Sequence, residues 1–156
     1  MTNKFAVAFV LLLALMALQG CSSPTAPSPG GYEIYKLSEL DISEGIVLID
    51  FMATWCSPCR TQIDELKKVH EGYGNRIEIL SVDIITWETE KQLADFKRDA
   101  GAKWKFAFDD MGLSQDYGVT SIPTLLLLKD GELQFSHEGL ISSSALSKEI
   151  AQLLEE

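Results

Sequence analysis

The apolar positions of the chain follow two periods, and together these predict an α/β domain. Residues 46–51 (IVLIDF) form a nearly continuous apolar run rich in branched side chains, which is typical of a strand buried on both faces. An apolar stripe at helical spacing follows and predicts a helix that ends near Gly72 or Gly74. Its members are Ile63, Leu66 and Val69. A second buried strand over residues 77–83 completes a strand-helix-strand unit, which predicts a parallel pair with a right-handed crossover.

The second half of the chain predicts two more helices and three more strands. Thr86 can cap a polar helix that ends near Gly101, and an amphipathic helix is expected over residues 143–154. The dipeptide Asp130-Gly131 is a two-residue hairpin signal between the last two strands. The strands are expected over residues 106–108, 124–129 and 133–137. The apolar positions of the two helices are Leu93 and Phe96 in the first and Leu146, Ile150, Leu153 and Leu154 in the second.

The N-terminal segment has the features of an export signal. Residues 5–18 are an uncharged apolar run after Lys4, which matches a signal peptide and is too short for an ordinary membrane span. The next residues, LQGC at positions 18–21, resemble the lipobox of prokaryotic lipoproteins, in which the cysteine is lipidated after cleavage. The resemblance implies a lipid anchor on Cys21. An uncleaved anchor, or an ordinary cleavage site with a free cysteine, is the alternative.

The chain therefore divides into three parts. We expect a signal peptide over residues 1–20 and a lipid-anchored linker over residues 21–31, whose sequence after Cys21 (SSPTAPSPGG) cannot build a core. The folded domain is expected over residues 32–156. This organisation predicts an extracytoplasmic, membrane-anchored lipoprotein of a prokaryotic cell.

Composition and charge narrow the function classes. With 46% apolar and 23% charged residues in 156 positions, the chain has the composition of one globular domain. Its formal net charge is −10 and it has no basic cluster, so we expect no binding to nucleic acids.

The pair Cys56 and Cys59 is the main candidate for chemistry. It lies between a buried strand and the start of a helix, where free backbone N–H groups and the helix dipole stabilise a thiolate. Pro58 fits the first helical turn, where no N–H is needed. We expect Cys56 to be the exposed nucleophile that attacks a disulfide, and Cys59 to resolve the mixed disulfide. The same steps run backwards oxidise a dithiol, so the motif leaves the direction open.

Other uses of a cysteine pair fit the sequence less well. A zinc site needs further ligands, but the chain has no second cysteine pair, and His70 and His137 lack ligand spacing. Haem attachment requires a histidine where Arg60 stands. We therefore expect no metal and no cofactor beyond the redox-active disulfide. A static structural disulfide of Cys56 and Cys59 stays as the alternative.

Two segments resemble the thioredoxin superfamily: VLIDFMATWCSPC at residues 47–59 and GVTSIPTLLLLKDGE at residues 118–132. The resemblance extends from residue 32 to the C-terminus. It implies a thioredoxin fold, in which helices flank a central mixed β-sheet. It also implies that Pro123 is a cis-proline facing the cysteines. The backbone at Ile122, just before it, can then pair with an extended substrate segment.

The resemblance assigns further roles around the cysteines. Asp50 takes the position of the buried acid that helps to deprotonate the resolving Cys59; burial of such a carboxyl raises its pKa. A strand-end Asp50 that faces solvent is the alternative. Trp55, together with Pro58, is expected to border the substrate-docking surface. Trp87 and Trp104 are interpreted as core or edge packing, without a catalytic role.

The stretch between Asp83 and the segment at residues 121–123 is long enough for an added helix and strand. Such an insertion resembles the TlpA- and ResA-like branch, whose members are membrane-anchored and often reduce disulfides in apocytochrome c or other exported proteins. The resemblance therefore implies exported protein substrates and a membrane electron donor. The dipeptide Ser57-Pro58 is not diagnostic of one pathway, so the substrate stays open.

Together these features predict an extracytoplasmic thiol-disulfide oxidoreductase that reduces or exchanges disulfides through a dithiol-disulfide cycle of Cys56 and Cys59, with cytochrome c maturation as one candidate pathway. A redox-inactive binding module for exported partners is one alternative. A thiol peroxidase is another, although Ala53 stands where that class has a threonine three residues before its cysteine.

Overall fold

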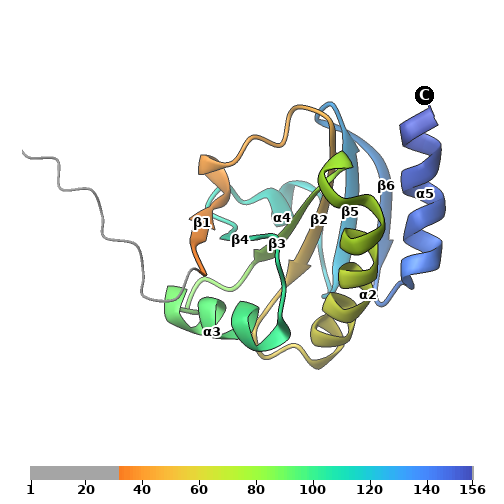
Figure 1. Ribbon diagram of the computed structural model, residues 1–156. Coiled ribbons are helices and arrows are strands. Elements are labelled where there is room, and N and C mark those ends of the chain that lie inside the picture. The colour runs from red at the N-terminus through yellow and green to blue at the C-terminus, as the bar shows by residue number, and fades with distance from the viewer. Residues whose placement is uncertain (1–31, 156) are drawn as a thin grey trace, which may run out of the picture.

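A computed structural model describes residues 32–155, in which helices flank one six-stranded sheet (Figure 1). The strand order is β1-β4-β3-β2-β5-β6. The strands are β1 (Ile34–Lys36), β2 (Ile46–Met52), β3 (Glu78–Asp83), β4 (Lys105–Phe108), β5 (Thr124–Lys129) and β6 (Glu132–Glu138). The helices are α2 (Ser57–Tyr73), α3 (Glu90–Ala100), α4 (Leu113–Asp116) and α5 (Ser143–Glu155), with the 3-10 turns η1 (Leu37–Glu39) and η2 (Gly74–Arg76).

The sheet is mixed, as the family resemblance implies. The strands β1, β4, β3 and β2 run parallel to their neighbours, whereas β5 pairs antiparallel with β2 and β6 pairs antiparallel with β5. The unit α3–β4 is the expected insertion between the first strand-helix-strand unit and the proline segment. Its strand β4 lies between β1 and β3. The predicted α/β fold with a central mixed sheet is therefore confirmed.

Two apolar clusters cover the two faces of the sheet. All seven residues of β2 are buried, and they alternate between the faces. One face packs against α2, α3 and α5, and α2 contacts both of the other helices (Figure 1). The other face packs against η1 and the region of α4. A buried strand in the centre therefore holds the start of α2 at a fixed place.

Most predicted elements are confirmed to within one or two residues, but the start of the inserted helix is not. The sequence predicts a cap at Thr86, whereas Thr89 caps α3 in the structure. The Thr89 hydroxyl oxygen accepts from the Gln92 amide N–H, and the Gln92 side chain accepts from the Thr89 amide N–H. Only Thr89 is followed by Gln at the third helical position, so only Thr89 can form this reciprocal pair.

Further details also differ from the sequence analysis. The hairpin at Asp130-Gly131 is confirmed, because both residues have positive φ (51° and 79°). Trp104 is buried as expected, but Trp87 is 67% exposed, so core packing is the wrong interpretation for it. Leu154 is 38% exposed and does not share the buried face of α5 with Leu146 and Ile150. The short elements β1, η1 and α4 were not predicted.

No helix within residues 32–155 is long and apolar enough to cross a membrane. The predicted signal peptide, linker and lipid-modified Cys21 lie outside the described residues.

Candidate active site

The junction of β2 and α2 carries the cysteine pair, with Cys59 in the first turn of the helix. Cys56 is the N-cap residue of α2, and Pro58 lies in the first turn as expected. Cys56 and Cys59 form a disulfide, with Cα atoms 5.2 Å apart. The Cys59 amide N–H points at the Cys56 sulfur, with 3.1 Å between nitrogen and Sγ. A thiolate at Cys56 would therefore receive a backbone hydrogen bond and the positive end of the helix dipole.

The two cysteines are more buried than the sequence predicts. Cys56 is only 3% exposed and Cys59 is fully buried, so the expectation of an exposed Cys56 is wrong for this disulfide form. The cause includes a loop from the other half of the chain, because the Ile122 carbonyl oxygen lies 3.8 Å from the Cys56 Sγ. Trp55, directly before the pair, is 60% exposed. Cys56 is the more accessible cysteine of the two.

The peptide bond between Ile122 and Pro123 is cis, as the family resemblance implies. Pro123 directly precedes β5, which pairs with β2, so the sheet places this turn next to the junction of β2 and α2, where Cys56 lies. The residue before the cis-proline, Ile122, therefore lies beside Cys56.

Asp50 is fully buried in β2, on the sheet face that α2 covers. Burial raises the pKa of this carboxyl to about 7, although a hydrogen bond from Ser81 opposes the rise. The Ser81 hydroxyl donates to Asp50 Oδ2 at 3.0 Å, and Oδ1 has no hydrogen-bond partner among the described residues. A solvent-facing Asp50 is thus excluded. Its unpartnered oxygen is free to exchange a proton.

A polar chain behind Asp50 was missed in the sequence analysis. The indole N–H of Trp104 donates to Ser81 Oγ at 3.0 Å, and Ser81 in turn donates to Asp50. All three side chains are buried. The register of β2 and β3 pairs Asp50 with Ser81, which brings two polar residues together inside two otherwise apolar strands. The polar Ser81 within the otherwise apolar run ILSV at residues 79–82 is the feature of the sequence that pointed to a buried polar contact.

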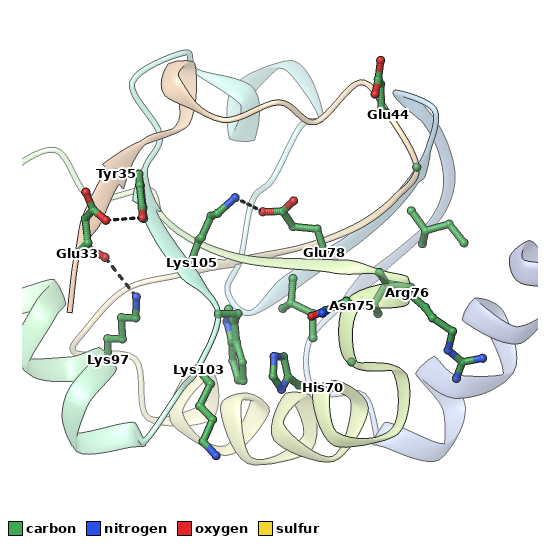
Figure 2. A pocket seen from close by; sticks show the side chains of 16 residues that line it. Glu33, Tyr35, Glu44, His70, Asn75, Arg76, Glu78, Lys97, Lys103 and Lys105 are labelled. Carbon is green, nitrogen blue, oxygen red and sulfur yellow. Dashed lines mark hydrogen bonds and ion pairs between the residues drawn. The ribbon is translucent and has the colours of Figure 1, made fainter. Parts of the chain in front are cut away.

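A separate cavity of about 590 Å³ lies at the other end of the sheet (Figure 2). It is lined by the starts of β2, β3 and β4, whereas the cysteines follow the end of β2. Several of its polar groups bind one another, as in the pair of Lys105 and Glu78 at 2.6 Å. Within residues 32–155 no three His, Cys, Asp or Glu side chains are grouped as metal ligands.

Comparisons with known proteins agree with this geometry. A family described as thioredoxin-like domain matches residues 36–154. Thioredoxin of Bacillus subtilis (strain 168) is 32% identical over 108 residues, which cover 69% of this chain and 82% of that protein. The thioredoxin-like protein YneN of the same organism is 29% identical over 117 residues, which cover 74% of this chain and 69% of that protein.

A solved structure with a similar fold is described as a thiol-disulfide interchange protein. It is the crystal structure of a putative thiol:disulfide interchange protein DsbE from Chlorobium tepidum. The two structures align with a TM-score of 0.63 at 26% identity, over 72% of this chain and 82% of that one. We therefore reject the alternative of a redox-inactive binding module, because the chain has the cysteine pair, the cis-proline and relatives of this kind. The chain belongs to the thioredoxin-like family, and it is a thiol-disulfide oxidoreductase.

Proposed function

We propose that the protein reduces disulfides of exported proteins outside the cytoplasm, while a lipid on Cys21 holds it at the membrane. The observation that carries the redox part is the position of Cys56, whose sulfur caps α2 and contacts the carbonyl of Ile122 before the cis-proline. This arrangement stabilises a thiolate at the place where an extended substrate can be held.

The reaction proceeds by two thiol-disulfide exchanges. The Cys56 thiolate attacks one sulfur of the substrate disulfide, so a mixed disulfide forms and the first substrate thiolate leaves. Cys59, once deprotonated, attacks the Cys56 sulfur and releases the second substrate thiolate. The substrate gains two electrons and two protons, and the protein is left with the Cys56–Cys59 disulfide. A membrane electron donor then returns it to the dithiol.

Asp50 serves this cycle as the proton partner of Cys59. Both side chains are fully buried on the same side of the sheet, where water cannot readily take the proton. A pKa of about 7 allows Asp50 to accept a proton near neutral pH. The hydrogen bond from Ser81 holds Oδ2 and leaves Oδ1 for the transfer.

The substrate lies across the surface formed by Trp55, Pro58 and Ile122, directly before the cis-proline Pro123. Trp55 and Pro58 are exposed, Ile122 is half-buried beside Cys56, and Pro123 is buried. Hydrogen bonds to the backbone of Ile122 bind any extended segment, which suits an enzyme that acts on several exported proteins. Apocytochrome c is one candidate substrate.

The proposed location follows from the sequence before the domain. A signal peptide over residues 1–20 directs export, and the linker over residues 21–31 separates the lipid anchor from the domain over residues 32–156. Attachment at the membrane brings the domain close to a membrane-embedded electron donor.

An insulin reduction assay tests the proposal. The wild-type protein with dithiothreitol should accelerate insulin reduction, and Cys56→Ser should not. Equal rates with both proteins would contradict the redox mechanism. The reduction potential of the Cys56–Cys59 couple then decides the direction, because a value near −270 mV marks a reductant and one near −120 mV an oxidant.

A further inference from the structure

Two buried carboxyl groups that the proposed cycle does not use lie behind the cysteine loop. Asp83 ends β3 and is 1% exposed, and Glu88 lies in the connection from β3 to α3 and is 7% exposed. The two carboxyl groups are within hydrogen-bonding reach of each other. Such a pair requires an explanation, because two neighbouring buried carboxylates repel each other.

Three of the four carboxyl oxygens of Asp83 and Glu88 accept a hydrogen bond. Asp83 Oδ1 accepts from the Ile85 amide at 2.8 Å, and both Glu88 oxygens accept from the Thr54 amide, at 3.1 and 3.3 Å. Asp83 Oδ2 has no donor among the described residues. A proton on Oδ2 lets it donate to the Glu88 carboxylate, so that every oxygen then has a partner.

No positively charged group among the described residues neutralises the negative charge of the Asp83 and Glu88 pair. The described residues contain no cation paired with Asp83 or Glu88. Charged groups on the surrounding elements have other partners. Asp50 on β2 accepts from Ser81, and Asp109 after β4 accepts from Ser114. Arg60 on α2 lies over the ring of Phe96, and Lys91 on α3 pairs with Asp95. Cys56 and Cys59 are the other titratable groups nearby, and they are joined as a disulfide. Burial, and then the Glu88 carboxylate, raise the pKa of Asp83 to about 7.

The pair is connected to the docking surface through Thr54. This residue directly precedes Trp55 and Cys56, so its amide fixes the loop from which both project. The Ile84 amide also donates to the Met52 carbonyl at 3.2 Å, at the start of the same loop. The loop over residues 53–55 is thus held against the β3–α3 connection by the Glu88 carboxylate.

We propose that Asp83 and Glu88 share one proton and are positioning residues that hold the loop of residues 53–55 for substrate docking. The proposal rests on the proposed function, in which Trp55 and Cys56 meet the substrate. Loss of the shared proton places two negative charges side by side, and Glu88 then moves away from the Thr54 amide. The loop loosens, and protein substrates bind less tightly as the pH rises above neutrality.

Two variants of Glu88 separate positioning from proton sharing. Glu88→Ala removes the acceptor of the Thr54 amide. Glu88→Gln keeps the contacts without a titrating pair, because its amide oxygen accepts from Thr54 and its NH₂ group donates to Asp83 Oδ2. Glu90→Ala, at an exposed position two residues further, is the matched control.

The first measurement is hydrogen exchange at the Thr54 amide, expressed as a protection factor, which needs no turnover. It should fall about tenfold in Glu88→Ala at pH 7, the loss expected for one charge-assisted hydrogen bond. In the wild type it should decline between pH 6 and pH 8.5, and in Glu88→Gln it should stay constant. Equal protection in the wild type and Glu88→Ala, or the same pH decline in Glu88→Gln, would overturn the proposal.

The second measurement is steady-state insulin reduction by the same variants. Glu88→Ala should raise KM about tenfold with a much smaller change in kcat, because the lost interaction acts on substrate binding. An unchanged KM would show that the pair does not serve docking and would overturn the proposal. If the wild type itself fails to reduce insulin, the proposed function fails, and the exchange data still decide whether the proton is shared.

Discussion

The substitution Asp50→Asn tests most directly whether burial raises the pKa of the Asp50 carboxyl. The pKa of Asp50 is about 7 in the folded protein, against an ordinary value of 3.8. As the pH rises from about 4 to about 7, an unfolded chain therefore releases this proton while the folded protein still holds it. Stability must fall across that window and level off above it, because the folded state binds more protons there. A difference of about three pH units corresponds to a loss of about 4 kcal/mol.

Urea unfolding of the disulfide form measures this loss. Asp50→Asn has no titration at this position, so its free energy of unfolding relative to the wild type should increase by about 4 kcal/mol between pH 4 and pH 8.5. Any constant cost of the new amide cancels in this comparison, and so does the titration of Asp83, which is present in both proteins. Asp64→Asn, which removes an exposed acid from α2, is the control.

A pH-independent difference between Asp50→Asn and the wild type would refute the reasoning. It would mean that Asp50 titrates alike in the folded and unfolded protein. The acid could then not hold a proton near neutrality, and its role beside Cys59 would lose its basis.

Three further predictions concern the site and the anchor. Ser81→Ala removes the hydrogen bond that lowers the pKa of Asp50, so the pH midpoint for resolution of a mixed disulfide should move upward in stopped-flow experiments; an unmoved midpoint would exclude the contribution of Ser81. Cys59→Ser should accumulate a mixed disulfide between Cys56 and a substrate on non-reducing gels, and a failure to trap one would contradict the order of attack. Cys21→Ala should release the protein from the membrane fraction, whereas unchanged fractionation would count against lipidation.

The fold was largely predictable because its central strands have unambiguous patterns. The run over residues 46–51 is apolar at nearly every position, and β2 is buried on both faces. The pattern therefore directly predicts a strand in the centre of the sheet. The start of α3 was harder, because Thr86 and Thr89 are both possible caps and only the side chain of Gln92 distinguishes them. The three-residue strand β1 is too short to show a period.

The site was predictable where the chemistry lies within a continuous motif, and not where it depends on strand register. Cys56, Cys59 and Pro123 each stand in a recognisable segment. The contact of Ser81 with Asp50 exists because β2 and β3 pair in one register, and Trp104 enters from the loop before β4. A shift of the register by one residue would send Ser81 to the other face of the sheet. The local sequence alone therefore could not specify the hydrogen bonds that link Trp104, Ser81 and Asp50.

Asp50 and Asp83 lie on the same face of the sheet and have similarly raised pKa values, but their neighbours favour opposite states. Ser81 donates to Asp50 and stabilises its ionised form, whereas the Glu88 carboxylate stabilises the protonated form of Asp83. A pH titration of the wild type should therefore show two overlapping steps near neutrality, which we assign to different functions. Asp50→Asn should leave the step that loosens the Thr54 amide, and Glu88→Gln should leave the step that governs resolution by Cys59. If either substitution removed both steps, the two acids would form one coupled system, and separate roles in proton transfer and loop positioning could not be assigned to them.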